Sequence, residues 1–66
     1  MNSELLRGVM EKRGVSQKEL AVYIGIRLST LKKKIRGESE FTLSEINKVS
    51  EILFLKSREI MLIFFT

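Results

Sequence analysis

A run of positive charge is the feature of this sequence best suited to chemistry. Ten positions hold five basic residues and no acidic one, namely Arg27, Lys32, Lys33, Lys34 and Arg36. The whole chain carries a net charge of +4, so the residues outside this run sum to about −1. Lysine and arginine bind phosphate oxygens, and charge this concentrated on one element is typical of a surface for a polyanion. Double-stranded DNA is the leading candidate.

Few other residues could act as catalysts. The sequence contains no histidine, cysteine or aspartate, which leaves glutamate, serine, lysine and Tyr23 for acid–base or nucleophilic roles. No pair of these has a recognisable catalytic spacing, so we do not expect an enzyme. The missing cysteine and histidine also exclude disulfides and the usual zinc sites. We expect no cofactor, no metal and no small-molecule ligand.

Length and apolar content predict one small domain over residues 1–66. The N-terminus lacks the basic start and apolar run of a signal peptide. The longest apolar run, Ile60 to Phe65, is far shorter than the roughly 20 residues needed to span a bilayer. We therefore expect a cytoplasmic protein with no membrane partner.

Apolar residues at helical spacing, together with capping signals, predict five short helices in an all-α fold. Ser16 with Glu19, and Thr42 with Glu45, form the pattern of a capping box. We expect the elements at about Asn2 to Arg13, Ser16 to Ile24, Leu28 to Gly37, Thr42 to Phe54 and Ser57 to Phe65.

Two of these segments carry further expectations. The helix after Thr42 is expected to bury an apolar stripe formed by Leu43, Ile46, Val49 and Leu53. The last segment is expected to be capped by Ser57 and to turn Ile60, Ile63 and Phe64 inward. Its β-branched and aromatic content also permits a strand, but we favour the helix because no hairpin partner is evident.

Residues 17–36 meet the requirements of a helix-turn-helix. Two helices joined by a tight turn must approach closely, and the small Ala21 lies in the middle of the first helix. Gly25 permits a positive φ in the turn. Leu31 and Ile35 are four residues apart and supply an apolar inner face for the second helix.

The phrases SQKELAVYIG and STLKKKIRGE resemble the Cro/CI-type helix-turn-helix family, also called the XRE family. The resemblance covers about Leu5 to Leu53 and implies a lambda-repressor-like fold and sequence-specific DNA binding. It implies a Cro-like transcriptional repressor. Because 66 residues leave no room for a separate ligand-sensing domain, promoter occlusion is the simplest mechanism. The tail EIMLIFFT resembles the ending of short phage proteins, which suggests a phage or prophage origin.

The resemblance also implies which side chains contact DNA. In this family the second helix of the motif enters the major groove and offers its N-terminal side chains to base edges. Here these side chains are Leu28, Ser29, Lys32 and Lys33, of which Lys33 is suited to guanine. Gln17 matches a position that contacts phosphate, and we expect Arg27 and Arg36 to be phosphate clamps.

Two residues depart from the family pattern. Arg27 stands where relatives usually have a capping serine or threonine, and losing such a cap costs about 1 kcal/mol. Lys34 stands where many relatives bury an apolar side chain. Either Lys34 extends along the edge of the core to solvent, or the helix is rotated slightly toward Ile35.

A protein-binding module, such as an antirepressor or an antitoxin, is the main alternative. Six consecutive apolar residues cannot all face one core, so we expect some of Met61, Leu62 and Phe65 to be exposed. An exposed apolar patch often marks an interface, which here could be a homodimer contact through the C-terminal segment. The other interpretation is that the segment simply closes the domain. A membrane-surface role is not expected, because the basic helix lacks aromatic anchors.

Overall fold

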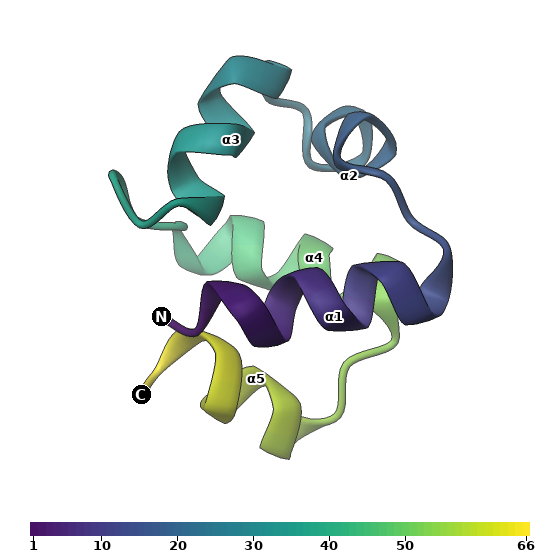
Figure 1. The fold of residues 1–66 in the computed structure, drawn as a ribbon, viewed down its shortest axis with the longest axis vertical. Helices are drawn as coiled ribbons and strands as arrows, with labels where there is room; N and C mark the ends of the chain where they lie inside the picture. Colours follow the sequence, from purple (N-terminus) through teal and green to yellow (C-terminus); the bar gives the residue numbers. More distant parts are fainter.

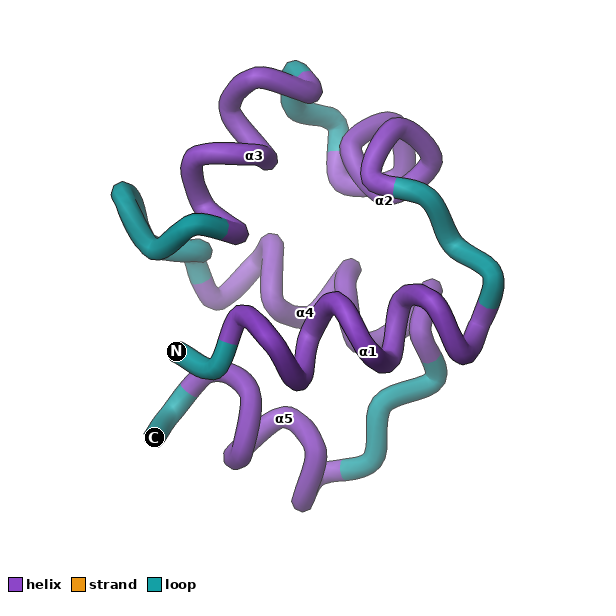
Figure 2. The backbone as a smooth tube through the Cα atoms, in the orientation of Figure 1, coloured by secondary structure: helices purple, strands orange, loops and turns teal.

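Five α-helices and no strand make up the computed structural model, which describes residues 1–66 (Figures 1 and 2). The all-α prediction is therefore confirmed, and the last segment is a helix rather than a strand. The helices are α1 (Ser3–Arg13), α2 (Gln17–Ile24), α3 (Leu28–Ile35), α4 (Leu43–Leu53) and α5 (Ser57–Phe64).

Local hydrogen bonds explain where the helices begin. The Ser16 hydroxyl accepts from the Glu19 N–H while the Glu19 carboxylate accepts from the Ser16 N–H. Thr42 and Glu45 exchange the same pair of bonds, so both predicted capping boxes are confirmed. At the first helix, Asn2 provides the cap.

The predicted cap of the last helix is wrong. Lys56, not Ser57, is the N-cap of α5, and Ser57 is already the first helical residue. The Glu59 carboxylate accepts from the Lys56 N–H at 2.9 Å. This bond satisfies the backbone N–H of Lys56, which has no partner within the helix. The helix can therefore begin at Ser57, one residue earlier than a cap at Ser57 would allow.

The five helices pack around one core. In Figure 1, α1 and α4 run side by side across the middle, α5 lies below them, and α2 and α3 lie above. α2 packs against α3 and α4, while α5 packs against α1 and α4. Consequently α3 lies at the edge of the molecule, on the side opposite α5.

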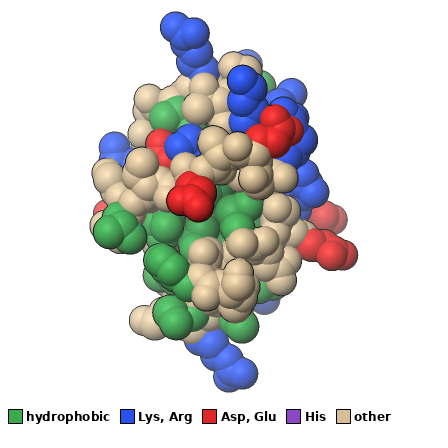
Figure 3. Space-filling model, turned by 90° about the vertical axis from the view of Figure 1, so that its left-hand side faces the viewer, with side chains coloured by type: hydrophobic (Ala, Val, Ile, Leu, Met, Phe, Trp, Pro, Cys, Tyr) green, Lys and Arg blue, Asp and Glu red, His purple; other side chains and the backbone are tan.

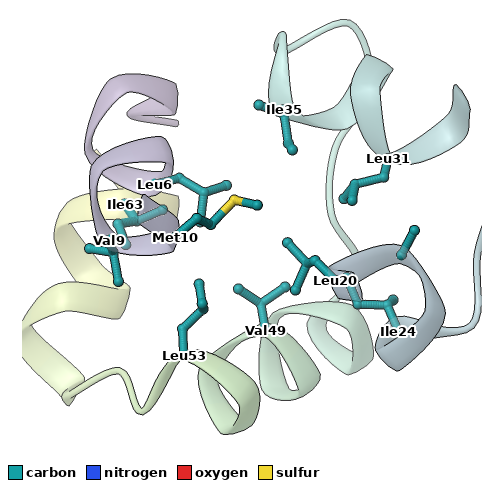
Figure 4. Packing of buried hydrophobic residues seen from close by; sticks show 11 residues of the cluster. Leu6, Val9, Met10, Leu20, Ile24, Leu31, Ile35, Val49, Leu53 and Ile63 are labelled. Carbon is teal, nitrogen blue, oxygen red and sulfur yellow. The ribbon is translucent and has the colours of Figure 1, made fainter. Parts of the chain in front are cut away.

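All five helices contribute to one apolar cluster, and Figure 4 shows the side chains converging between them. In this view the side chains of α1 and α5 enter from one side, those of α2 and α3 from the other, and those of α4 from below. The cluster consists of Leu6, Val9, Met10, Leu20, Ala21, Ile24, Leu31, Ile35, Val49, Leu53 and Ile63.

The predicted stripe of α4 is correct except at its first position. Ile46, Val49 and Leu53 are buried, but Leu43 is 72% exposed. Leu43 occupies the first turn, where it lines a surface groove together with Phe41 and Phe64 rather than reaching the core cluster. The apolar spacing of the helix continues into this turn, but the core does not.

The two chain ends lie together at one side of the molecule (Figure 1). The Asn2 N–H donates to the Ile63 carbonyl at 2.7 Å. The Met1 ammonium donates to the Thr66 carbonyl at 3.4 Å. The start of α1 and the end of α5 are therefore held as neighbours by backbone hydrogen bonds.

Helices α1 and α4 both end at a residue in the left-handed conformation. At the end of α1 this residue is Gly14, with φ of 68°, and at the end of α4 it is Phe54, with φ of 54°. A side chain at this backbone conformation is strained, whereas glycine is not. The Phe54 ring is also 74% exposed, so little packing offsets the strain.

We therefore expect Phe54→Gly to raise the free energy of unfolding by about 0.5–1 kcal/mol, because relief of strain exceeds the added entropy of the unfolded chain. Gly14→Ala is the matched control. No atom lies within 4 Å of the added Cβ, so its expected loss of about 1 kcal/mol reports backbone strain alone. Urea unfolding followed by circular dichroism measures both changes. A destabilised Phe54→Gly variant would show that the ring makes a stabilising contact.

Candidate nucleic-acid interface

The outer side of α3 carries four exposed polar side chains. Leu31 and Ile35 are 0% and 1% exposed, and their burial fixes which side of the helix faces the core. Residues at spacings of three, four and seven then share the opposite side. These are Ser29, Lys32, Lys33 and Arg36, and all four are exposed, as the spacing predicts.

The N-terminal end of α3 has an open backbone. Arg27 is its N-cap residue, and no side chain accepts a hydrogen bond from the first turn. The Arg27 side chain is exposed, so it is free to reach a phosphate. Unsatisfied N–H groups at a helix start attract anions. The missing cap thus leaves polar donors next to the basic side of the helix.

Leu28 and Gln17 are less accessible than the other predicted contacts. Leu28 is half-buried and packs partly against the core cluster. Gln17 is the first residue of α2 and is also half-buried. The Ser16 cap, which begins α2 at Gln17, fixes this position. Both residues therefore offer only part of their side chains to a ligand.

Arg36 lies at the C-terminal end of α3 and has an acidic neighbour. Its guanidinium forms an exposed ion pair with the Glu38 carboxylate. The hydrogen bond between the two groups raises the pKa of Arg36 and lowers the pKa of Glu38. Lys33 also lowers the pKa of Glu38, to a smaller extent. Glu38 therefore competes with any anion for Arg36.

Lys34 does not belong to the exposed side. Its side chain is 11% exposed, and its Nζ donates to Glu45 Oε1 at 2.7 Å and to the Glu40 carbonyl at 2.9 Å. Of the two alternatives expected for Lys34, extension of the ammonium along the core edge to solvent is therefore wrong. Because Leu31 and Ile35 remain fully buried on either side of it, the lysine is accommodated by an internal ion pair with α4.

Glu45 is held in its ionised form by these contacts. Burial raises the pKa of the Glu45 carboxyl. Hydrogen bonds from Lys34 and from the Thr42 backbone lower it by more than burial raises it, so the pKa lies below the ordinary 4.5. One carboxylate thus accepts from the start of α4 and from the end of α3. The sequence shows Glu45 only as a capping residue, so its role as the partner of Lys34 was missed.

A surface groove of about 580 Å³ lies beside the end of α3. Arg36, Gly37, Ser39 and Glu40 form its polar side. Figure 3 views the molecule from the side where the chain ends meet, and hydrophobic side chains gather over the lower half of that face. The apolar lining consists of Met1, Phe41, Leu43, Ile46, Phe64 and Phe65.

Comparison with known families identifies the family of the chain. A family model described as helix-turn-helix matches residues 6–60. The chain belongs to this family. It is a Cro/CI-type helix-turn-helix protein, a DNA-binding transcription regulator of the XRE type, and the predicted family membership is confirmed. Searches of curated proteins and of solved structures found no significant match.

α2 and α3 are the two helices that we expect from the sequence to form the helix-turn-helix motif, with α3 as its recognition helix. Gly25 joins them with φ of 87°, and Ala21 is buried in the middle of α2, as the sequence predicts. The five-helix fold is consistent with the lambda-repressor-like architecture. None of the helices has the length and apolar character that crossing a bilayer requires.

The Glu45 carboxylate should make stability depend on acid. Its pKa is lowered by folding, so its contribution is complete above the unfolded-state value near 4.5 and is lost as the pH falls through the lower folded-state value. We expect wild-type protein to lose more stability than Glu45→Gln when the pH falls from about 5 to about 3. Urea unfolding at each pH measures this difference. Parallel pH profiles would contradict the assignment.

Proposed function

We propose that this chain is a Cro-like repressor that binds a specific DNA sequence as a homodimer and occludes a promoter. The observation that carries the proposal is the outward side of the recognition helix, where four exposed side chains include three cations and no acid. Double-stranded DNA is the partner that fits this surface. The protein would act in the bacterial cytoplasm.

Each residue has a proposed role. Ser29, Lys32 and Lys33 would meet base edges, since they occupy the exposed side of α3. Leu28 would touch a thymine methyl with the part of its side chain that the core leaves free. Arg27, Arg36 and Gln17 would bind phosphates, and the open start of α3 favours such contacts.

The apolar groove supports the homodimer. Leu43 and Phe65, which line the groove, are 72% and 54% exposed, and Met61 and Leu62 of α5, outside the groove, are 58% and 44% exposed. Exposed apolar patches in small proteins mark interfaces. A dimer would place two recognition helices about one helical turn of DNA apart, which is the spacing of paired half-sites.

The same groove favours a second candidate function, a protein-binding module such as an antirepressor or an antitoxin. In that case the groove would hold another protein and the basic helix would only keep the surface soluble. Selection of bound duplexes from a random pool separates the two functions. Enrichment of a short two-fold symmetric sequence supports the repressor, whereas no enrichment, with no duplex bound at low salt, contradicts it.

Lys33→Ala is expected to weaken binding to the selected duplex by about 1–3 kcal/mol and to relax preference at one base position. The reason is that a base-edge contact contributes discrimination as well as affinity. Lys56→Ala, on the far side of the molecule at the start of α5, is the matched control and should change neither. Fluorescence anisotropy with single-substitution duplexes measures the effect. Equal weakening on every sequence would make Lys33 a phosphate contact.

Arg36→Ala is expected to weaken binding to all sequences and to flatten the dependence of log affinity on log salt by about one unit. Glu38→Gln should strengthen binding to all sequences, because it frees Arg36 from its ion pair and removes a negative charge. Lys56→Ala at the start of α5 is again the control. Titrations at several salt concentrations measure the slope, and an unchanged slope for Arg36→Ala would remove this residue from the interface.

A further inference from the structure

Among the five residues of the basic run, Lys34 alone is turned inward. Its ammonium has two oxygen partners, Glu45 Oε1 and the Glu40 carbonyl, and lies 5.9 Å from the centroid of the Phe41 ring. No buried polar side-chain atom in the molecule lacks a hydrogen-bond partner. The charge of Lys34 is thus satisfied inside the protein and is not presented to a ligand.

The partners of Lys34 belong to a rigid part of the fold. Glu45 lies in the first turn of α4, and its carboxylate is fixed there by the Thr42 backbone. Phe41 packs edge-on against Phe64 of α5, with ring centroids 5.4 Å apart. The Ser3 hydroxyl, at the start of α1, donates to the Ile35 carbonyl. The C-terminal end of α3 is therefore tied directly to α1 and α4, and through Phe41 to α5.

The N-terminal half of α3 has no comparable polar anchor, although Leu28 packs against the core cluster. Arg27 provides no side-chain cap, and Leu31 and Ile35 are the only fully buried apolar side chains of this eight-residue helix. Successive residues are about 100° apart around a helix axis. Holding Lys34 inward between Leu31 and Ile35 therefore narrows the rotation that their burial allows, and with it the directions in which Ser29 and Lys33 point.

We propose that Lys34 is a positioning residue for DNA recognition: through Glu45 and the Glu40 carbonyl it fixes the rotation of the recognition helix, and it does not bind DNA itself. The inference rests on the proposed function and deepens it. It separates one of the five basic residues from the DNA-binding set. It also makes α4 a support for the base-reading surface.

The test compares Lys34→Met with Lys32→Met, in which an exposed neighbour is removed instead. Binding to the selected duplex and to a random-sequence duplex is measured across salt, at a temperature where circular dichroism shows each variant folded. Lys34→Met should bind the selected duplex roughly tenfold more weakly, which equals about one base contact, with an unchanged salt slope. Lys32→Met removes an exposed cation that would reach a base edge, so it should bind both duplexes more weakly, the selected duplex by the larger factor, with a slope flatter by about one unit.

Lys34→Arg keeps a cation within reach of both acceptors and should recover most of the lost affinity. If Lys34→Met does not fold, Glu45→Gln takes its place, because it keeps the shape of the side chain and removes the counter-charge. It should also bind the selected duplex more weakly relative to the random one.

Three results would overturn the inference. One is a salt slope that flattens in Lys34→Met as much as in Lys32→Met, which would place the Lys34 ammonium at the DNA. Another is wild-type preference for the selected duplex in a folded Lys34→Met or Glu45→Gln variant. The third is a wild-type protein that binds no duplex, which would overturn the proposed function itself and leave Lys34 nothing to position.

Discussion

The burial of Leu31 and Ile35 is the interaction on which the DNA-facing surface depends. These two side chains hold α3 against the core, and all four exposed polar side chains of the helix owe their direction to them. Burying a side chain of this size contributes about 1.5–3 kcal/mol. A 66-residue chain without disulfides has little stability beyond such contacts, so the basic helix is presented to DNA by a small amount of buried surface.

The sequence predicted the parts of the fold that depend on neighbouring residues. Capping boxes at Ser16 and Thr42 are local patterns, so the helix starts that they define could be read directly. The burial of Leu31 and Ile35 followed from their spacing. The end of the core could not be predicted this way, because Leu43 continues the spacing of α4 beyond the point where other helices cover it.

The environment of Lys34 could not be predicted for a related reason. Its acidic partner is 11 residues away in sequence, and only the packing of α3 against the start of α4 brings the two together. The exposed side of α3 was predictable because helical geometry alone defines it. Which exposed residues touch bases and which touch phosphates depends on the docking of the protein on DNA, and this is proposed from the family.

The meeting of the two chain ends has a consequence for topology. Because Met1 and Thr66 are joined by a hydrogen bond, a short peptide linker could connect them without disturbing either terminal helix. The chain could then be opened elsewhere, for instance in the connection between α4 and α5, which is remote from α3. The order in which the helices follow one another is thus separable from the way they pack, and a circularly permuted protein should still present the same basic helix.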